Sequence, residues 1–166
     1  THLRADFHVC GAPKPLEDTV FMTTRHADHI PGTLMATRLA PGNRGGLRLR
    51  IFGSEAGLEW DLEDCKRMKL NRFGEPDQVL SRGHGHGVSD ATERLVRTPR
   101  GFPEGLIEAW ANLYTEFAMA VAARKDGIQT PSDWLRLPNV ADGVKGVRFI
   151  HASVRSNAAS GAWEEV

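Results

Sequence analysis

The sequence predicts an α+β domain with an open, mostly antiparallel β-sheet and helices packed on one face of that sheet. Three observations lead to this prediction. Strand-like alternation is concentrated in the first half of the chain, helical periodicity is concentrated in the second half, and the candidate strands follow one another through short turns. Short turns favour antiparallel pairing over βαβ crossovers. Strands that precede helices, without regular alternation between the two, are typical of the α+β class.

The clearest strand signal is a hairpin. Residues 47–51 read Leu-Arg-Leu-Arg-Ile and residues 58–62 read Leu-Glu-Trp-Asp-Leu, so apolar and charged side chains alternate in both. Such alternation predicts two half-buried strands, and the glycine-bounded segment 53–57 predicts the turn between them. Further strands are predicted at 19–25, 32–39, 65–71 and 78–81, and a short closing strand at 161–166.

Two helices are predicted after residue 100. In the first, Leu106, Trp110, Leu113, Phe117 and Val121 recur on one face, and Arg-Lys-Asp-Gly at 124–127 marks its end. Glu104 and Glu108, one turn apart, are interpreted as carboxylates that stabilise the positive end of this helix. The second helix is expected to begin near residue 141, with Asp142 in its first turn. Its apolar face consists of Val140, Val144, Val147, Ile150 and Val154.

Length and charge exclude several classes of protein. The chain has 166 residues, with 21 Lys and Arg against 21 Asp and Glu, so it has no overall attraction to nucleic acid or anionic membranes. We expect a single domain over residues 1–166. The apolar stretch 117–123 is far shorter than the roughly 20 residues of a membrane span. Cys10 and Cys65 form no CxxC pair and are expected to be reduced thiols of a soluble, cytoplasmic protein.

The sequence contains few motifs with a direct chemical meaning. No GxGxxG or GxxxxGK[ST] phosphate-binding motif and no Gly-x-Ser-x-Gly nucleophile elbow is present. Arg48 and Arg50 alternate with apolar residues, and we interpret them as the solvated face of a strand that blocks edge pairing; nucleic-acid binding is not expected. We therefore predict no catalytic, cofactor-binding or metal site from these patterns.

Histidines suggest one metal-binding alternative. His84 and His86 alternate with glycines, and His26, His29 and Cys65 are the possible remote partners. Zinc needs three or four converging ligands, and only two-residue and three-residue spacings are visible. A solvated loop at 83–87 and a turn at 26–29 are the favoured interpretations.

Four segments that occur in order along the chain carry more specific information. They are residues 32–42, 49–61, 101–114 and 142–163, and they include Gly-Ser-Glu-Ala-Gly-Leu-Glu-Trp-Asp at 53–61 and Gly-Phe-Pro-Glu-Gly at 101–105. Together they resemble the C-terminal domain of the glucose-fructose oxidoreductase, inositol dehydrogenase and rhizopine-catabolism (Gfo/Idh/MocA) family.

This resemblance implies a two-domain, NAD- or NADP-dependent oxidoreductase that acts on a sugar, polyol or related hydroxyl compound. The family's N-terminal Rossmann domain, its Glu-Lys-Pro loop and its Asp-x-x-x-His helix are not encoded in these 166 residues. Hydride transfer requires a held nicotinamide and a base, so the chain alone is expected to be inert and to bind no cofactor. Because the sequence starts at Thr1, we expect it to be a piece of a longer protein.

The resemblance also implies which residues lie near the substrate. The loop before the long helix adjoins the active site in the family, so Arg97 and Arg100 are predicted to hydrogen-bond sugar hydroxyls or a carboxylate. Phe102 stands where the family commonly has His before Pro-Glu-Gly, which suggests a less polar or differently shaped substrate. A solvated loop is the alternative for both arginines.

The resemblance implies a homo-oligomer formed through the open sheet face. The leading hypothesis is therefore the substrate-binding and oligomerisation domain of an oxidoreductase. The alternative is a free-standing dimerisation or ligand-binding module that shares the fold without redox activity.

Overall fold

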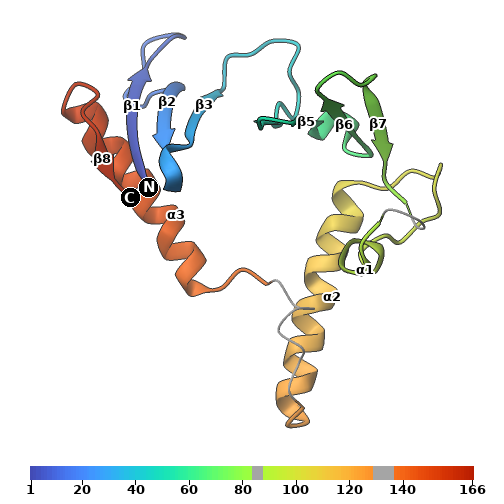
Figure 1. Ribbon diagram of the computed structural model, residues 1–166. Helices are drawn as coiled ribbons and strands as arrows, with labels where there is room; N and C mark the ends of the chain where they lie inside the picture. The colour runs from blue at the N-terminus through green and yellow to red at the C-terminus, as the bar shows by residue number, and fades with distance from the viewer. Residues whose placement is uncertain (84–87, 129–136) are drawn as a thin grey trace. The chain divides into compact units, whose positions relative to one another are not determined.

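The computed structural model describes residues 1–83, 88–128 and 137–166. The chain divides into two compact units, the first formed by Thr1–Gly42 with Pro138–Val166 and the second by Asn43–Leu137 (Figure 1). Each unit carries its own antiparallel four-stranded sheet, and helices accompany both. The α+β class and the antiparallel strands are thus confirmed. One domain over residues 1–166 stays a prediction.

The first unit is built on a sheet with the order β3-β2-β1-β8. Its strands are β1 (His2–His8), β2 (Thr19–Arg25), β3 (Pro31–Thr37) and β8 (Glu164–Glu165). The strands predicted at 19–25, 32–39 and 161–166 are therefore present, although β8 is shorter than predicted. The connection between β2 and β3 is a single 3-10 turn, Ala27–His29, as the turn interpretation of the His26 and His29 segment predicts.

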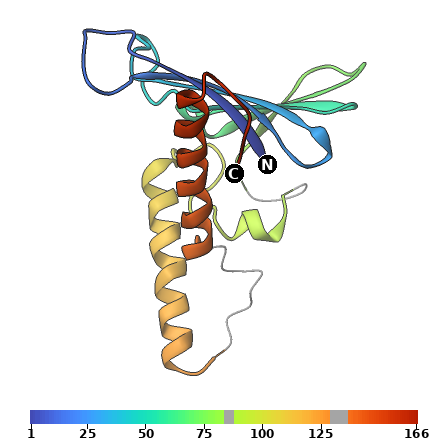
Figure 2. The same cartoon turned by 90° about the vertical axis from the view of Figure 1, so that its left-hand side faces the viewer.

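The C-terminal half of helix α3 (Val140–Ala158) packs against β1 on one side of this sheet (Figure 2). Its start is fixed by Asn139, whose side-chain oxygen accepts hydrogen bonds from the backbone N–H of Ala141 and Asp142. Asp142 in turn accepts from Asn139 N, so the two residues form a reciprocal cap.

The face of α3 that enters the core is not its aliphatic stripe. Leu3, Ala5 and Ala152 form the buried core, and Phe149 and Met22 pack around it. The stripe from Val140 to Val154 is exposed instead; the five members range from 43% to 85% exposure. Small side chains at the contact let the helix lie close to the strand, and hydrophobic periodicity alone does not reveal which face has that property.

Ser156 joins the helix, the sheet and the C-terminal segment. Strand β8 pairs only with His2 and Leu3, so the outer edge of β1 has no strand partner beyond Leu3. There Ser156 Oγ accepts a hydrogen bond from Ala5 N at 2.9 Å and donates one to Ala162 O at 2.6 Å. Asn157 Oδ1 accepts from Phe7 N at 2.9 Å. Two helix side chains thus take the place of the missing strand.

The long connection between β1 and β2 closes around Asp18, which is 5% exposed. Its carboxylate accepts hydrogen bonds from Cys10 N, Gly11 N and the Thr19 hydroxyl, and Lys14 Nζ lies 2.8 Å from Oδ2. The hydrogen bond from Lys14, followed by that from Cys10 N, lowers the pKa of Asp18 well below its ordinary value.

The second unit contains the predicted hairpin. Its sheet has the order β4-β5-β6-β7, with β4 (Arg48–Phe52), β5 (Ala56–Asp61), β6 (Arg67–Arg72) and β7 (Gln78–Ser81). Cross-strand registers put Leu49, Trp60, Met68 and Leu80 in one row and Arg50, Glu59 and Lys69 in another. The sheet therefore has an apolar face and a charged face, and Arg48 pairs with Asp61 at 2.7 Å.

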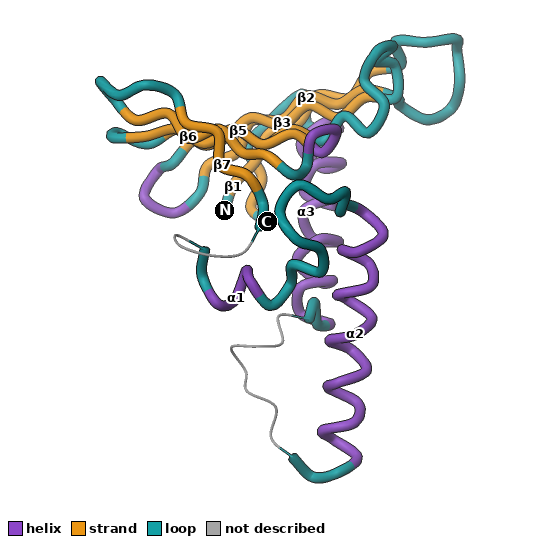
Figure 3. The backbone as a smooth tube through the Cα atoms, turned by 90° about the vertical axis from the view of Figure 1, so that its right-hand side faces the viewer, coloured by secondary structure: helices purple, strands orange, loops and turns teal. Residues whose placement is uncertain are grey.

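Helix α2 (Leu106–Lys125) belongs to the second unit, as does the short helix α1 (Asp90–Glu93), which the sequence analysis did not predict (Figure 3). Polar contacts join α2 to the residues that follow α1. Asn112 Nδ2 donates to Leu95 O at 2.7 Å, and Arg94 pairs with the buried Glu116. The predicted apolar stripe of α2, from Leu106 to Val121, is 36% to 66% exposed.

Replacement of Ser156 by Ala is expected to lower the free energy of unfolding by about 1–3 kcal/mol, because the buried N–H of Ala5 loses its acceptor. Urea unfolding measures this change. Ser153→Ala is the matched control: Ser153 is also buried in α3, but its hydroxyl donates to Phe149 O of its own helix at 2.8 Å and reaches the sheet through the weak acceptor Met22 Sδ at 3.6 Å. Equal losses in the two variants would contradict the proposed bridging role of Ser156.

Asp18 predicts an acid-dependent loss of stability. A carboxyl whose folded pKa is depressed contributes stability above its unfolded pKa of about 3.9 and loses it as the pH falls through the folded value. The melting temperature should therefore fall between about pH 5 and pH 2 more steeply for the unmodified protein than for Asp18→Asn. If the melting temperatures of the two proteins fall equally over that pH range, Asp18 does not contribute to the acid-dependent loss of stability.

Candidate functional site

The loop of residues 97–102 lies in the second unit, between α1 and α2, and its base is built on the ion pair of Arg82 and Glu104. Arg82 directly follows β7, and Glu104 directly precedes the α2 cap residue Gly105. The two side chains meet with Arg82 Nη1 at 2.5 Å from Glu104 Oε2. Glu104 is 8% exposed, so the pair is largely withdrawn from water.

Glu104 also binds the loop backbone. Its carboxylate accepts hydrogen bonds from Arg97 N at 3.1 Å, from Thr98 N at 2.8 Å and from the Thr98 hydroxyl at 2.8 Å. Burial alone raises the pKa of Glu104, but the hydrogen bonds from Arg97 and Thr98, together with the charge of Arg82, outweigh burial and leave the pKa below its ordinary value. The carboxylate is therefore ionised at neutral pH and occupied by four donors.

Arg82 binds the other end of the same loop. Its Nη2 donates to Phe102 O at 3.2 Å and to Thr98 Oγ1 at 3.1 Å. The tip is a turn in which Phe102 N donates to Pro99 O at 3.2 Å. Gly101 occupies its third position with φ of 96°, a conformation that glycine adopts without strain.

The three predicted site residues lie in three different environments. Arg97 lies along α2, where its Nε donates to Asn112 Oδ1 at 2.5 Å and its Nη2 to Thr115 Oγ1 at 2.9 Å. Arg100 is exposed and lies over Gly83, where an added Cβ would come within 2.8 Å of Arg100 Nε. Phe102 is 61% exposed. All three stay predictions as substrate-binding residues.

Sequence reasoning assigned Glu104 and Glu108 the same role, and the structure separates them. Glu108 does stabilise the helix start, since it accepts a hydrogen bond from Gly105 N at 2.7 Å. Glu104 instead faces Arg82 and the loop backbone. No signal in the sequence pairs Arg82 with a residue 22 positions away, because that contact depends on how the segment after β7 folds back.

A small cavity of about 280 Å³ adjoins this ion pair. Its walls are mainly apolar and include Trp60, Leu62, Leu106 and Ala109, and Arg82 and Glu104 form part of the lining. The Trp60 indole donates to Cys65 O at 3.2 Å and is thereby fixed at the cavity wall. The loop therefore borders a surface with both ionic and apolar character.

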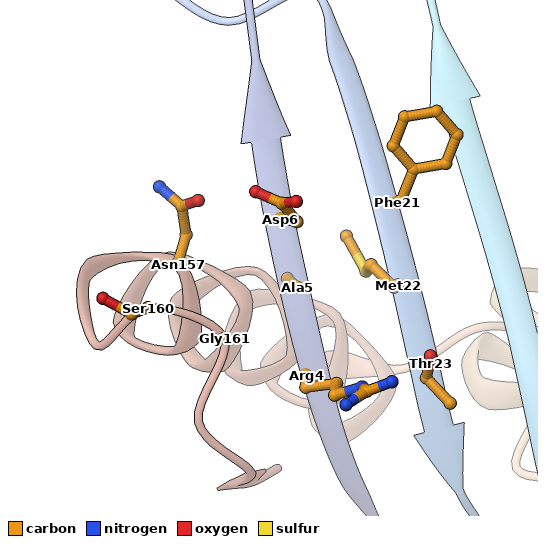
Figure 4. Close-up of a pocket in the computed structure, with 9 residues that line it drawn as sticks. All are labelled: Arg4, Ala5, Asp6, Phe21, Met22, Thr23, Asn157, Ser160 and Gly161. Carbon is orange, nitrogen blue, oxygen red and sulfur yellow. The ribbon is translucent and has the colours of Figure 1, made fainter.

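The first unit carries a more polar depression of about 510 Å³ on its sheet (Figure 4). Arg4 and Asp6 from β1 and Phe21 and Thr23 from β2 line it, with Asn157 and Ser160 at the end of α3. Nearby, the Arg25 guanidinium stacks on the Trp163 ring at 4.0 Å. The strand residues Arg4, Asp6, Phe21 and Thr23 belong to the sheet face opposite the core residues Leu3 and Ala5, because side chains alternate between the faces of a strand.

The described residues contain neither a cluster of metal-ligating side chains nor a parallel strand pair. Among residues 1–83, 88–128 and 137–166, no group of three His, Cys, Asp or Glu side chains converges. His84 and His86 lie outside the described residues. All strand pairs in the two sheets are antiparallel, so the described residues contain no βαβ unit. In the same part of the chain, no helix has the length and apolar character required to cross a bilayer.

The chain is similar to known oxidoreductases in sequence and in structure. No protein-family model matches the chain. An uncharacterised oxidoreductase of Bacillus subtilis (strain 168), YfiI, is 34% identical over 157 residues, which are 93% of this chain and 39% of that protein. The chain therefore spans well under half the length of this curated relative.

Solved structures resemble the chain over nearly its whole length. An oxidoreductase from Sinorhizobium meliloti is 36% identical with a TM-score of 0.87, over 99% of this chain and 46% of that one. An inositol dehydrogenase homolog from Azotobacter vinelandii, crystallised with NAD+, is 33% identical with a TM-score of 0.89, over 99% and 42%. The same homolog is known with NADH and myo-inositol. Levoglucosan dehydrogenase, at 19% identity and a TM-score of 0.70, shares the fold.

Proposed function

We propose that this chain is the C-terminal, substrate-binding and oligomerisation domain of an NAD- or NADP-dependent oxidoreductase of the Gfo/Idh/MocA family. The observation that carries the proposal is the likeness to the Azotobacter inositol dehydrogenase homolog over 99% of the chain at 33% identity. The order of the four sequence segments supports it independently. The parent enzyme acts on a sugar, polyol or related hydroxyl compound.

In this proposal the nicotinamide is held by polypeptide outside these 166 residues. Without that part, the chain positions no hydride donor or acceptor and is inert. The residues that it contributes bind and orient the substrate, which raises the effective concentration of the reacting hydroxyl beside the cofactor. The unpaired thiols of Cys10 and Cys65 support a cytoplasmic location.

The 97–102 loop is the proposed substrate contact. The planar guanidinium of Arg100 offers several N–H donors to vicinal hydroxyls or a carboxylate, and the exposed ring of Phe102 provides an apolar surface for the C–H face of the substrate. Arg97 extends the positive charge of the loop from its anchored position on α2.

The full-length oxidoreductase is expected to reduce NAD+ or NADP+ with at least one member of a panel of cyclic polyols and sugars. The absorbance of the reduced nicotinamide measures this reaction. Arg100→Ala should raise the KM of that substrate about tenfold, because a charge-assisted hydrogen bond is lost. Arg124→Ala, an exposed arginine at the end of α2, is the control.

Two results would contradict the proposal. Absence of turnover with every polyol and sugar would favour the alternative of a module without redox activity. Tight nucleotide binding by these 166 residues alone, measured calorimetrically, would show that the cofactor site lies within them.

Oligomer formation through the open face of β1, β2 and β3 is also part of the proposal. Phe21 and Met35 are paired across β2 and β3 on that face and are 47% and 60% exposed. In a symmetric interface Phe21→Glu would bring two carboxylates together and bury them, which is unfavourable. The variant should therefore have a lower molecular mass in solution, as measured by light scattering. Phe73→Glu, at an exposed position of the second unit, should not. An unchanged mass for Phe21→Glu would place the interface elsewhere.

A further inference from the structure

We infer that Arg82, Glu104 and Thr98 are positioning residues that hold the 97–102 loop in its substrate-binding conformation, and that Arg97 is an anchor of this loop. The inference rests on the proposed function, because it assigns a role within the proposed substrate contact. It extends that proposal to residues that lie beneath the loop surface.

The first argument is that both ends of the loop converge on one ion pair. Glu104 accepts the backbone N–H groups of Arg97 and Thr98, where the loop begins. Arg82 donates to the carbonyl oxygen of Phe102, where the loop ends. A single carboxylate and a single guanidinium therefore fix the separation of the two ends, and the tip between them is closed by the turn from Pro99 to Phe102.

The second argument concerns Thr98, whose hydroxyl connects the two charged partners. It donates to Glu104 Oε2 at 2.8 Å and accepts from Arg82 Nη2 at 3.1 Å. Because a valine has nearly the same shape but no hydroxyl, this position allows the network to be weakened without removal of a buried charge. A serine retains the hydroxyl.

The third argument is the side chain of Arg97. Two of its nitrogens are engaged by Asn112 and Thr115 of α2, and Asn112 is itself bonded to Leu95 O. Arg97 thus ties the start of the loop to the helix. Arg100 and Phe102 are the members of the predicted site that the turn presents, so we expect specificity to depend on them and loop order to depend on Arg97.

The experiment uses the full-length oxidoreductase and compares Glu104→Gln, Thr98→Val and Thr98→Ser. Glu108→Gln is the matched control, because Glu108 also receives a backbone N–H at the start of α2 but makes its hydrogen bond to Gly105. Two readouts are collected for each variant: hydrogen exchange of the amides in residues 97–102, and the KM and kcat values for polyol and nucleotide.

Glu104→Gln and Thr98→Val are expected to speed amide exchange in the loop and to raise the polyol KM about tenfold and about threefold, with the nucleotide KM unchanged. Thr98→Ser and Glu108→Gln should stay within about twofold of the unmodified enzyme. Loop exchange unaffected by Glu104→Gln, or a KM change equal to that of Glu108→Gln, would overturn the inference.

The two proposals fail separately. If the unmodified enzyme turns over no polyol or sugar, the proposed function fails, and the exchange measurement alone decides whether Arg82, Glu104 and Thr98 order the loop. If turnover is present and the loop exchanges equally in every variant, the proposed function stands and the positioning role fails.

Discussion

A buried carboxylate that collects backbone N–H groups is the interaction on which both units of this protein depend. In the first unit Asp18 closes the segment between β1 and β2, and in the second Glu104 closes the loop before α2. Each carboxylate faces one cation, Lys14 or Arg82. Backbone N–H groups in irregular segments need acceptors when they are withdrawn from water, and one ionised carboxylate can satisfy several of them. Each loop is therefore tied to a carboxylate at its base.

The secondary structure was largely predictable from the sequence, because it depends on local periodicity. The alternation in residues 47–62 predicted the hairpin, and the spacing of Leu106, Trp110 and Leu113 predicted α2. The packing was less predictable. The valine face of α3 has the stronger hydrophobic signal, yet Ala152, Ser153 and Ser156 are the residues that face the sheet. Close approach depends on side-chain size at the contact, which a periodicity argument does not weigh.

The candidate site illustrates the same limit. Arg97, Arg100 and Phe102 came from a family resemblance, whereas the pair of Arg82 and Glu104 beneath them came only from the folded chain. A carboxylate at a helix start has a common local explanation, the helix dipole, and Glu108 conforms to it. Glu104 does not, because its partners are separated from it by 6, 7 and 22 residues in sequence. Contacts of that kind are set by the fold of the segments between them.

Ser156 and Asn157 have a consequence for the fate of the exposed strand edge in a crowded cell. Exposed strand borders recruit further strands and so initiate aggregation. By offering side-chain oxygens to the amides of Ala5 and Phe7, helix α3 occupies a stretch where a foreign peptide would otherwise pair. Strand addition at Ala5 and Phe7 is thereby hindered, which protects this side of the first sheet against intermolecular β-pairing.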